Sequence, residues 1–383
     1  MTRAREVPAV FARGGTSKGL LFHARDLPES AADRDALLLK VLGSPDENQR
    51  QLNGMGGGLS SLSKAVIVSR SSRDGVDLDY TFAQVAVDQP IVDYGLMCGN
   101  MSACVGPFAL REEIIDRGDG RATVMIHNTN TGKRLRASFD VCNGVAVEEG
   151  AFVIPGVSGS GAPIALDYLD PGGARTSRVL PTGRAVDQIE LPATSSQKAS
   201  TIDVSIVDAT NPVAFVRACD LDADASALPN ELEAHARLLD QLDTIRRAAA
   251  VASGMCEAPQ DAELANPKIA IVGPSSDART LDGRNVSAGD CDITMRMVSM
   301  GRVHRAVTLT GAMCAATAGR ISGSLVHSEL TAASDDGVLR IGTPSGVIPV
   351  SADVDQSDRG VWHVHRTRSY RTQRQLMRGV VFA

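Results

Sequence analysis

The chain has 383 residues, of which 43% are hydrophobic and 22% are charged, and its formal net charge at pH 7 is −6. This length predicts two domains of about 150 to 200 residues each, and the negative charge argues against a protein that binds nucleic acid by neutralising phosphates. Seven cysteines without a CxxC pair, no signal-like apolar run near residue 1 and no run of about 18 apolar residues lead us to expect a cytoplasmic protein with reduced thiols and no membrane partner.

The first distinctive segment is RGGTSKG at 13–19, which contains the residue types of a phosphate-binding loop in the wrong order. Such a loop reads Gly-x-x-x-x-Gly-Lys-Ser/Thr and opens a helix, whose first amides hold the phosphates. Here the apolar run 20–27 follows and is typical of a strand. The segment is therefore predicted to be a strand-to-strand turn that presents polar groups to another ligand, and ATP binding is the least favoured alternative.

Short β-like runs dominate the rest of the chain, with few helices between them. The predicted strands are 65–71, 77–87, 122–128, 200–208, 268–273 and 292–300, and the predicted helices are 31–43, 100–115, 230–253 and 312–321. This order favours an α+β protein in which sheets wrap round a helix over an alternating βαβ sheet.

The two halves of the chain also resemble each other in three places. GTSKGLLFHARDL aligns without a gap on ATNPVAFVRACDL, SKAVIVS on PKIAIVG, and CGNMSACVGPFAL on TGAMCAATAGRI, in the same order. Three ordered matches predict a duplicated unit. We expect similar domains at 1–182 and 183–383, a hinge in the Pro- and Gly-rich segment 171–187, and a site in the cleft between the domains. The C-terminal segment is expected to be able to pack back on the first domain.

Cys98 and Lys64 are the candidate catalytic residues. Cys98 precedes Gly99 and a predicted helix, and the unpaired amides at a helix start stabilise a thiolate; the alternative is a cysteine that only packs. Lys64 lies between a loop rich in glycine and serine and an apolar strand, where partial desolvation favours the neutral amine of a general base. The alternative, a solvated lysine at a strand end, is the stronger reading from the sequence alone.

Groups that bind an anionic substrate are expected at both predicted helix starts and in the polar loops. Amides at Gly99–Asn100 and Gly311–Ala312 can hold carboxylates, and Asn128 can add a donor, although Asn-Thr is also ordinary turn chemistry. The substrate-binding candidates are Arg13, Gly15, Thr16, Ser17, Ser60, Ser61, Ser63, Gly99, Asn100, Met101, Asn128, His304, Thr310, Gly311, Ala312 and Met313. A basic tail, 363–379, is read as a solvated strand face or as the source of an arginine that faces an anion.

No metal site and no cofactor are expected. The seven histidines form no HxxEH or HExxH pattern, and only His363 and His365 lie close together in the sequence.

Taken together, these segments resemble the PrpF-like isomerase family, whose members include methylaconitate isomerase and oxalomesaconate tautomerase. The matching segments are RGGTSKG (13–19), GMGG with SxxSK (54–64), DLDYTF (77–82), CGN (98–100), LPTGRAVD (180–187), HRAVTLTGAMC (304–314) and RTQRQLMRG (371–379). The resemblance implies a diaminopimelate epimerase-like fold, with each of two domains a mostly antiparallel sheet or barrel round a central helix. It also implies a cofactor-free allylic isomerase of unsaturated di- or tricarboxylic acids, with Lys64 and Cys98 at the active site.

Epimerases and racemases of this fold use two opposed cysteines, and the counterpart of Cys98 in the second half is Thr310. A threonine hydroxyl is too weak an acid for that role, so an amino-acid racemase is the less favoured alternative. A non-catalytic tricarboxylate-binding accessory protein is a further alternative. A homodimer is expected to be possible, with a small anionic acid as the ligand.

Overall fold

The computed structural model describes residues 5–95, 97–191, 200–264, 266–299, 301–330 and 337–383. The chain divides into two compact units, the first formed by 1–167 with 370–383 and the second by 168–369. The unit boundary lies upstream of the expected one at 182/183, because the Pro- and Gly-rich turn is bonded to a strand of the second unit. Gly173 donates its amide to the Asp208 carbonyl at 2.8 Å, and Thr210 donates to the Pro171 carbonyl at 2.9 Å.

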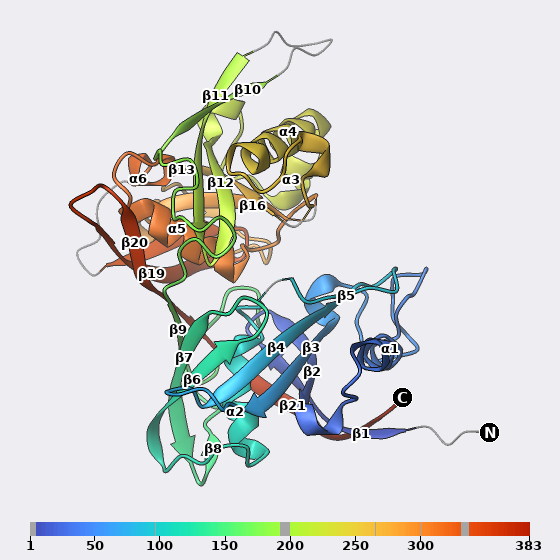
Figure 1. Ribbon diagram of the computed structural model, residues 1–383. Helices are drawn as coiled ribbons and strands as arrows, with labels where there is room; N and C mark the ends of the chain where they lie inside the picture. The colour runs from blue at the N-terminus through green and yellow to red at the C-terminus, as the bar shows by residue number, and fades with distance from the viewer. Residues whose placement is uncertain (1–4, 96, 192–199, 265, 300, 331–336) are drawn as a thin grey trace. The chain divides into compact units, whose positions relative to one another are not determined.

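Among its described residues the first unit contains two α-helices, and strands make up most of its regular secondary structure (Figure 1). Its elements are β1 (Glu6–Gly14), β2 (Ser17–His23), α1 (Ala31–Leu42), β3 (Lys64–Arg70), β4 (Leu78–Val85), β5 (Val92–Asp93), α2 (Ser102–Arg111), β6 (Gly120–Asn128), β7 (Arg134–Cys142), β8 (Val145–Ala146) and β21 (Gln373–Phe382). Strand β21 pairs antiparallel with β1 along its whole length, so the last segment of the chain completes the first unit. Two strands run across the unit boundaries, β9 (Ile164–Leu169) and β20 (Trp362–Arg371).

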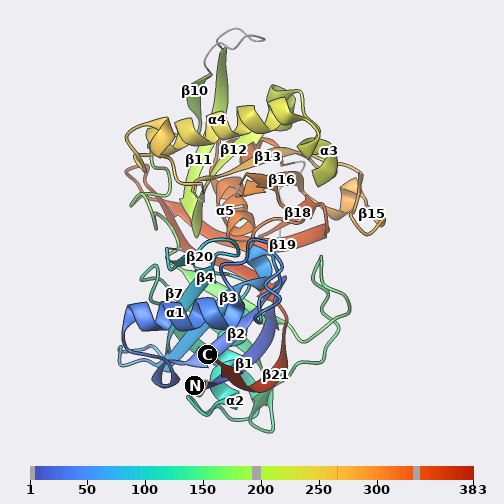
Figure 2. The same ribbon diagram turned by 90° about the vertical axis from the view of Figure 1, so that its right-hand side faces the viewer.

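The second unit has the same character, with four α-helices among the strands of the residues that the structure describes there (Figure 2). Its elements are β10 (Asp187–Leu191), β11 (Ser200–Ala209), β12 (Asn211–Arg217), α3 (Pro229–Glu233), α4 (Ala236–Ala252), β13 (Lys268–Pro274), β14 (Ala278–Arg279), β15 (Asn285–Val286), β16 (Ile293–Ser299), β17 (Arg302–Val303), α5 (Leu309–Arg320), α6 (Leu325–Ser328), β18 (Val338–Thr343) and β19 (Gly346–Gln356). The single helix expected at 230–253 is two helices, because the chain leaves the helical conformation at His235.

Strand register confirms the predicted duplication. Strand β2 pairs parallel with β3 so that Leu20 faces Ala65, and β12 pairs parallel with β13 so that Ala214 faces Ile269. These are the partners that the sequence alignment makes equivalent. The third strand continues the match, because the β3–β4 and β13–β16 pairs are both antiparallel. The units are therefore two copies of one strand–turn–strand scaffold with different side chains.

Each unit encloses one helix and carries another on the outside of its sheet. Every residue of α2 from Ser102 to Leu110 is buried, and so is α5 from Leu309 to Gly319. The outer helices α1 and α4 are amphipathic and bury one face only, for example Leu38 and Leu42 on α1 against Leu20 and Phe22. Burial of such apolar side chains, at roughly 25 cal/mol per Å², drives this packing. A mostly antiparallel sheet round a central helix is the fold class expected from the sequence.

Among the described residues, none of the helices combines the length and the apolar character that crossing a membrane requires.

Candidate active site

The turn between β1 and β2 is packed directly on the turn that precedes α2. Asn100 donates its side-chain amide to the Thr16 hydroxyl at 2.9 Å and lies 3.5 Å from the Ser17 hydroxyl. A Cβ on Gly15 would stand 2.2 Å from the Asn100 side-chain oxygen, and Gly15 also has a φ of +51°. Only glycine fits such a position. The two segments that the sequence singled out separately, RGGTSKG and CGN, therefore form one structure.

Cys98 is held at this turn by its carbonyl group. The carbonyl oxygen accepts hydrogen bonds from the Ser102 amide at 3.0 Å, from the Ser102 hydroxyl at 2.9 Å and from the Tyr80 hydroxyl at 3.3 Å. The helix itself begins at Ser102 rather than at 100. Cys98 is a partly exposed free thiol, whereas Cys104 in the helix is buried and desolvation raises the pKa of the Cys104 thiol. Of these two, only Cys98 is available to a ligand.

Lys64 is the first residue of β3, and side chains of β4 contact its amine. Its ammonium nitrogen donates to the Gln84 side-chain oxygen at 2.6 Å and lies 4.9 Å from the centre of the Phe82 ring. The Gln84 amide nitrogen donates to the carbonyls of Ser60 and Ser63 at 3.0 and 2.9 Å, which directs its oxygen at Lys64. Only 8% of Lys64 is exposed, so the solvated strand end is not what the structure shows. Within the described part of the chain, no carboxylate forms an ion pair with this lysine.

One face of β4 connects the two catalytic candidates. Side chains two apart on a strand share a face at a spacing of about 6.6 Å, and Tyr80, Phe82 and Gln84 are such a row. The first of them contacts Cys98 and the other two contact Lys64. Strand β2 provides a second link. Gly19 packs directly on the Lys64 backbone, because a Cβ on Gly19 would lie 2.4 Å from the Lys64 carbonyl oxygen. Two residues earlier on the same strand, the Ser17 hydroxyl lies near the Asn100 side chain. Lys64, at the start of β3, and the turn that contains Cys98 thus contact opposite ends of the same row of β4 side chains.

The serine-rich loop before Lys64 is fixed by the buried side chain of Gln51. Its amide nitrogen donates to the hydroxyls of Ser44 at 2.8 Å and Ser63 at 2.7 Å, and its oxygen accepts from the Gly58 amide at 3.0 Å. Ser63 is therefore buried and occupied inside the loop, whereas Ser60 is exposed and Ser61 is partly exposed. Ser60 and Ser61 are the loop hydroxyls that a ligand can reach.

Two arginines lie beside the Asn100 turn. Arg13 donates to the carbonyls of Gly15 and Thr372 at 3.1 Å each, and its half-burial lowers the pKa of the guanidinium. Arg371 is buried and donates to the Asn100 side-chain oxygen at 3.1 Å. Both belong to the first unit and bring positive charge close to Thr16 and Asn100.

In the second unit the equivalent turn also packs on a helix start. The Thr210 hydroxyl donates to the Thr310 carbonyl at 2.7 Å, and Asn211 donates to the Thr310 hydroxyl at 3.2 Å. Cys314 is buried, and its thiol contacts the Val207 carbonyl at 3.3 Å; this matches the expected packing role.

The expectation that Gly311 and Ala312 offer open amides differs from what the structure shows. Helix α5 begins at Leu309, earlier than expected, and Thr308 caps it. The Gly311 amide is bonded to the Thr308 hydroxyl at 3.1 Å and the Ala312 amide to the Thr308 carbonyl at 2.9 Å. The Met313 side chain is fully buried, so these residues are part of the helix interior.

Asn128 is likewise a structural residue. It is fully buried, its amide nitrogen donates to the Tyr80 carbonyl at 3.2 Å, and its oxygen accepts from the amide and hydroxyl of Thr131. The structure shows the turn role of Asn128, whose side-chain amide and oxygen are all bonded within the protein. His304 accepts the Ala306 amide at 3.0 Å through its ring and so closes the loop that leads to α5.

The sequence reading missed Tyr80, Phe82 and Gln84 as site residues and identified Arg371 only as one of a basic group. Tyr80 and Phe82 carried a signal, since they belong to the matching segment DLDYTF (77–82), whereas Gln84 lies outside that segment. Gln84 follows from the pairing of Lys64 with Gln84 across β3 and β4, which a single sequence does not reveal.

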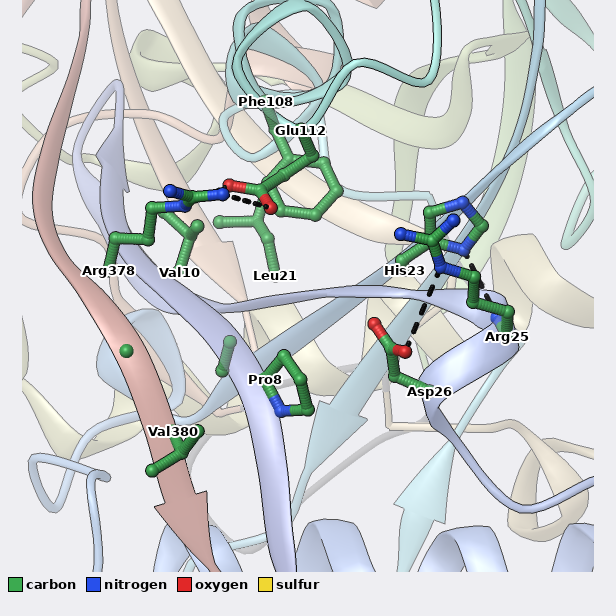
Figure 3. A pocket seen from close by; sticks show the side chains of 12 residues that line it. Pro8, Val10, Leu21, His23, Arg25, Asp26, Phe108, Glu112, Arg378 and Val380 are labelled. Atoms are coloured by element: carbon green, nitrogen blue, oxygen red, sulfur yellow. Dashed lines mark hydrogen bonds and ion pairs between the residues drawn. The ribbon is translucent and has the colours of Figure 1, made fainter.

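A pocket of about 320 Å³ in the first unit lies apart from this site (Figure 3). Its charged residues are paired with one another: Arg378 binds Glu112 at 2.8 Å, and Arg25 lies 3.9 Å from Asp26. None of the predicted site residues lines it.

Comparison with known proteins agrees with these features. The chain is 37% identical over 386 residues to 3-methylitaconate isomerase of Eubacterium barkeri, covering 100% of this chain and 98% of that protein. It is 37% identical over 393 residues to 2-methyl-aconitate isomerase of Cupriavidus necator, covering 98% and 96%. A crystal structure of methylitaconate-delta-isomerase superposes with a TM-score of 0.85 at 38% identity, covering 100% and 96%.

A hydroxyproline epimerase from Agrobacterium vitis superposes with a TM-score of 0.53 at 12% identity, covering 99% of this chain and 93% of that one, which shows a common fold alone. The family model described as PrpF protein matches residues 4–383. The chain therefore belongs to the PrpF protein family and is an isomerase.

Proposed function

We propose that this isomerase shifts a proton between two carbons of an allylic system in an unsaturated di- or tricarboxylic acid, with Lys64 and Cys98 as the proton-transferring groups. The observation that carries the proposal is the β4 row, which contacts the Cys98 turn through Tyr80 and the Lys64 ammonium through Gln84. An amine and a thiol that both reach a bound acid could serve one three-carbon segment of it.

The reaction needs no group other than a proton carrier and a means of stabilising charge. Removal of the proton from one end of the allylic system forms a dienolate, whose negative charge is shared with a carboxylate. Return of a proton two carbons away moves the double bond and leaves the composition unchanged. Proton transfer by a positioned side chain contributes about 100- to 10,000-fold to rate, and donors aimed at the developing charge contribute further.

The surroundings of Asn100 support an acidic substrate. Arg371 donates to Asn100, and Asn100 donates to Thr16, so cationic and hydroxyl groups lie together at one turn. Clamping carboxylates there would orient the C–H bond toward the catalytic groups. Relatives named for methylitaconate and methylaconitate over almost their whole lengths support acids of this class. The seven free cysteines support a cytoplasmic location.

The test is a panel of unsaturated acids followed by NMR in D2O, containing isomers of aconitate, methylaconitate, methylitaconate and oxalomesaconate. We expect the wild-type protein to isomerise at least one of them and to place solvent deuterium at the carbon that receives the proton. Cys98→Ser should slow that reaction strongly, whereas Cys142→Ser, which changes an exposed thiol elsewhere, should not.

Binding of these acids without isomerisation or exchange would favour an accessory protein. Equal rates for both cysteine variants would remove Cys98 from the mechanism.

A further inference from the structure

The two closely spaced histidines of the sequence meet two aspartates in the second unit. His365 Nε2 lies 2.9 Å from Asp355 Oδ2, and His363 Nε2 lies 3.6 Å from Asp170 Oδ1. The ring centres of the two histidines are 4.4 Å apart. One ligand atom each from Asp355, His363 and His365 lies within 4.8 Å of the other two.

These side chains come from three separate segments that the backbone holds together. His363 and His365 are two apart on β20 and therefore share a face of the strand. Asp355 faces His363 across the β19–β20 pair, and the Asp170 amide donates to the His365 carbonyl at 3.0 Å. Strand register and a backbone hydrogen bond thus fix the backbone positions of these residues relative to one another, and only their side-chain ends can rotate.

We propose that Asp170, Asp355, His363 and His365 form a surface site for a divalent transition metal such as Zn²⁺. Imidazole nitrogens with carboxylate oxygens suit zinc, nickel and copper, whereas magnesium and calcium prefer oxygen ligands alone. Tetrahedral zinc with bonds of about 2.0 to 2.1 Å needs ligand atoms about 3.4 Å apart. The side chains are between 48% and 73% exposed, so rotations of their outer bonds can close the remaining distance.

Charge at the cluster also favours a cation. The carboxylates of Asp355, Asp353 and Asp170 all lie close enough to His365 to act on it electrostatically. This concentration of negative charge would attract Zn²⁺ to the cluster.

The site would have a structural consequence, because its ligands lie next to both chain connections of the second unit. Asp170 closely follows the boundary at 167/168, and His365 closely precedes the boundary at 369/370. A metal bound here would connect the segment that contains Asp170 to the β19–β20 hairpin. This role is independent of Lys64 and Cys98, which belong to the first unit.

The test compares Zn²⁺ binding by the full-length protein and by three variants, using isothermal titration calorimetry. His363→Gln/His365→Gln removes both nitrogens, and Asp355→Asn weakens one oxygen ligand. His235→Gln is the matched control, because His235 is exposed and lies outside the cluster. All the changed positions are on the surface, and thermal unfolding without metal verifies that each variant is folded.

We expect the wild type and His235→Gln to bind one equivalent of Zn²⁺. The double variant should not bind this equivalent, and Asp355→Asn should bind it more weakly. Zn²⁺ should raise the melting temperature of the first two only, and Cu²⁺ bound to the wild type should show nitrogen couplings in its EPR spectrum that the double variant loses. The proposal is overturned if all four proteins bind the same number of Zn²⁺ equivalents with the same affinity, or if Mg²⁺ competes equally for the site.

Discussion

The two units have the same strand register and differ in the side chains which that register brings together. In the first unit the β4 row contacts the candidate catalytic residues. Continuing the β13–β16 register, the equivalent row of the second unit is Met295, Met297 and Ser299, in place of Tyr80, Phe82 and Gln84. Met297 packs so closely on α5 that a Cβ at Gly311 would stand 2.3 Å from its methyl group. The first unit thus has a tyrosine hydroxyl and a glutamine amide where the second has Met295 and the shorter Ser299.

The equivalent lysines differ as well. Both lysines are buried; Lys64 donates to the Gln84 side-chain oxygen, and desolvation lowers the pKa of Lys268 to about 8. Cys98 likewise has Thr310 as its counterpart. A common scaffold therefore does not imply common chemistry, and the comparison predicts that loss of Lys64 and loss of Lys268 have different effects.

The largest difference should appear on removal of each amine. Lys64→Ala is expected to lower kcat by about 100- to 10,000-fold with a much smaller change in KM, because a proton carrier acts in the transition state. Lys268→Met keeps the length and burial of the side chain and should retain most activity. Steady-state kinetics on the acid identified in the D2O panel measure both. Equal losses in the two variants would mean that the units contribute alike.

The pH dependence of stability should single out Lys268. The folded protein releases its proton near pH 8, whereas the unfolded chain holds it to about pH 10.5. Between these values the unfolded state binds more protons, so the free energy of unfolding rises with pH, and below pH 8 the full cost of burying the amine is present. At 1.36 kcal/mol per pH unit the gain is about 3 kcal/mol at most.

Urea unfolding of the wild type and Lys268→Met, at about pH 8 and about pH 10, measures this gain as the difference between the two proteins. A difference that does not change with pH would show that Lys268 has an ordinary proton affinity in the fold.

The smallest expected effect tests the β4 row. Gln84→Leu removes the acceptor of Lys64 and should lower kcat by about tenfold, since a hydrogen bond to a charged group is worth about 1.5 kcal/mol or more. KM should change little. Ser299→Ala, at the equivalent position of the second unit, is the control and should leave kinetics unchanged. A loss in KM alone for Gln84→Leu would indicate a role in binding and not in positioning Lys64.

Local patterns in the sequence predicted more of the fold than of the site. The turn at Gly15 and the helix at 31–43 follow from short-range signals, the duplication follows from the order of the repeated segments, and the structure confirms all three. The sequence predicts a start of α5 at 312, after the pair Gly311–Ala312. The helix begins three residues earlier, at Leu309, because Thr308 caps it. Gln84 and Arg371 could not be predicted as partners of Lys64 and Asn100, because strand register and the path of β20 bring them there.

The antiparallel pairing of β1 with β21 has a consequence for biosynthesis. The second unit is one continuous stretch of chain and can fold as soon as it leaves the ribosome. The first must wait, since roughly 200 residues separate its body from the strand that completes it. At about 5 to 20 residues per second this delay is about 10 to 40 s. During that time the edge of β1 is open to other strands, so a chaperone that shields it would improve the yield of correctly folded enzyme.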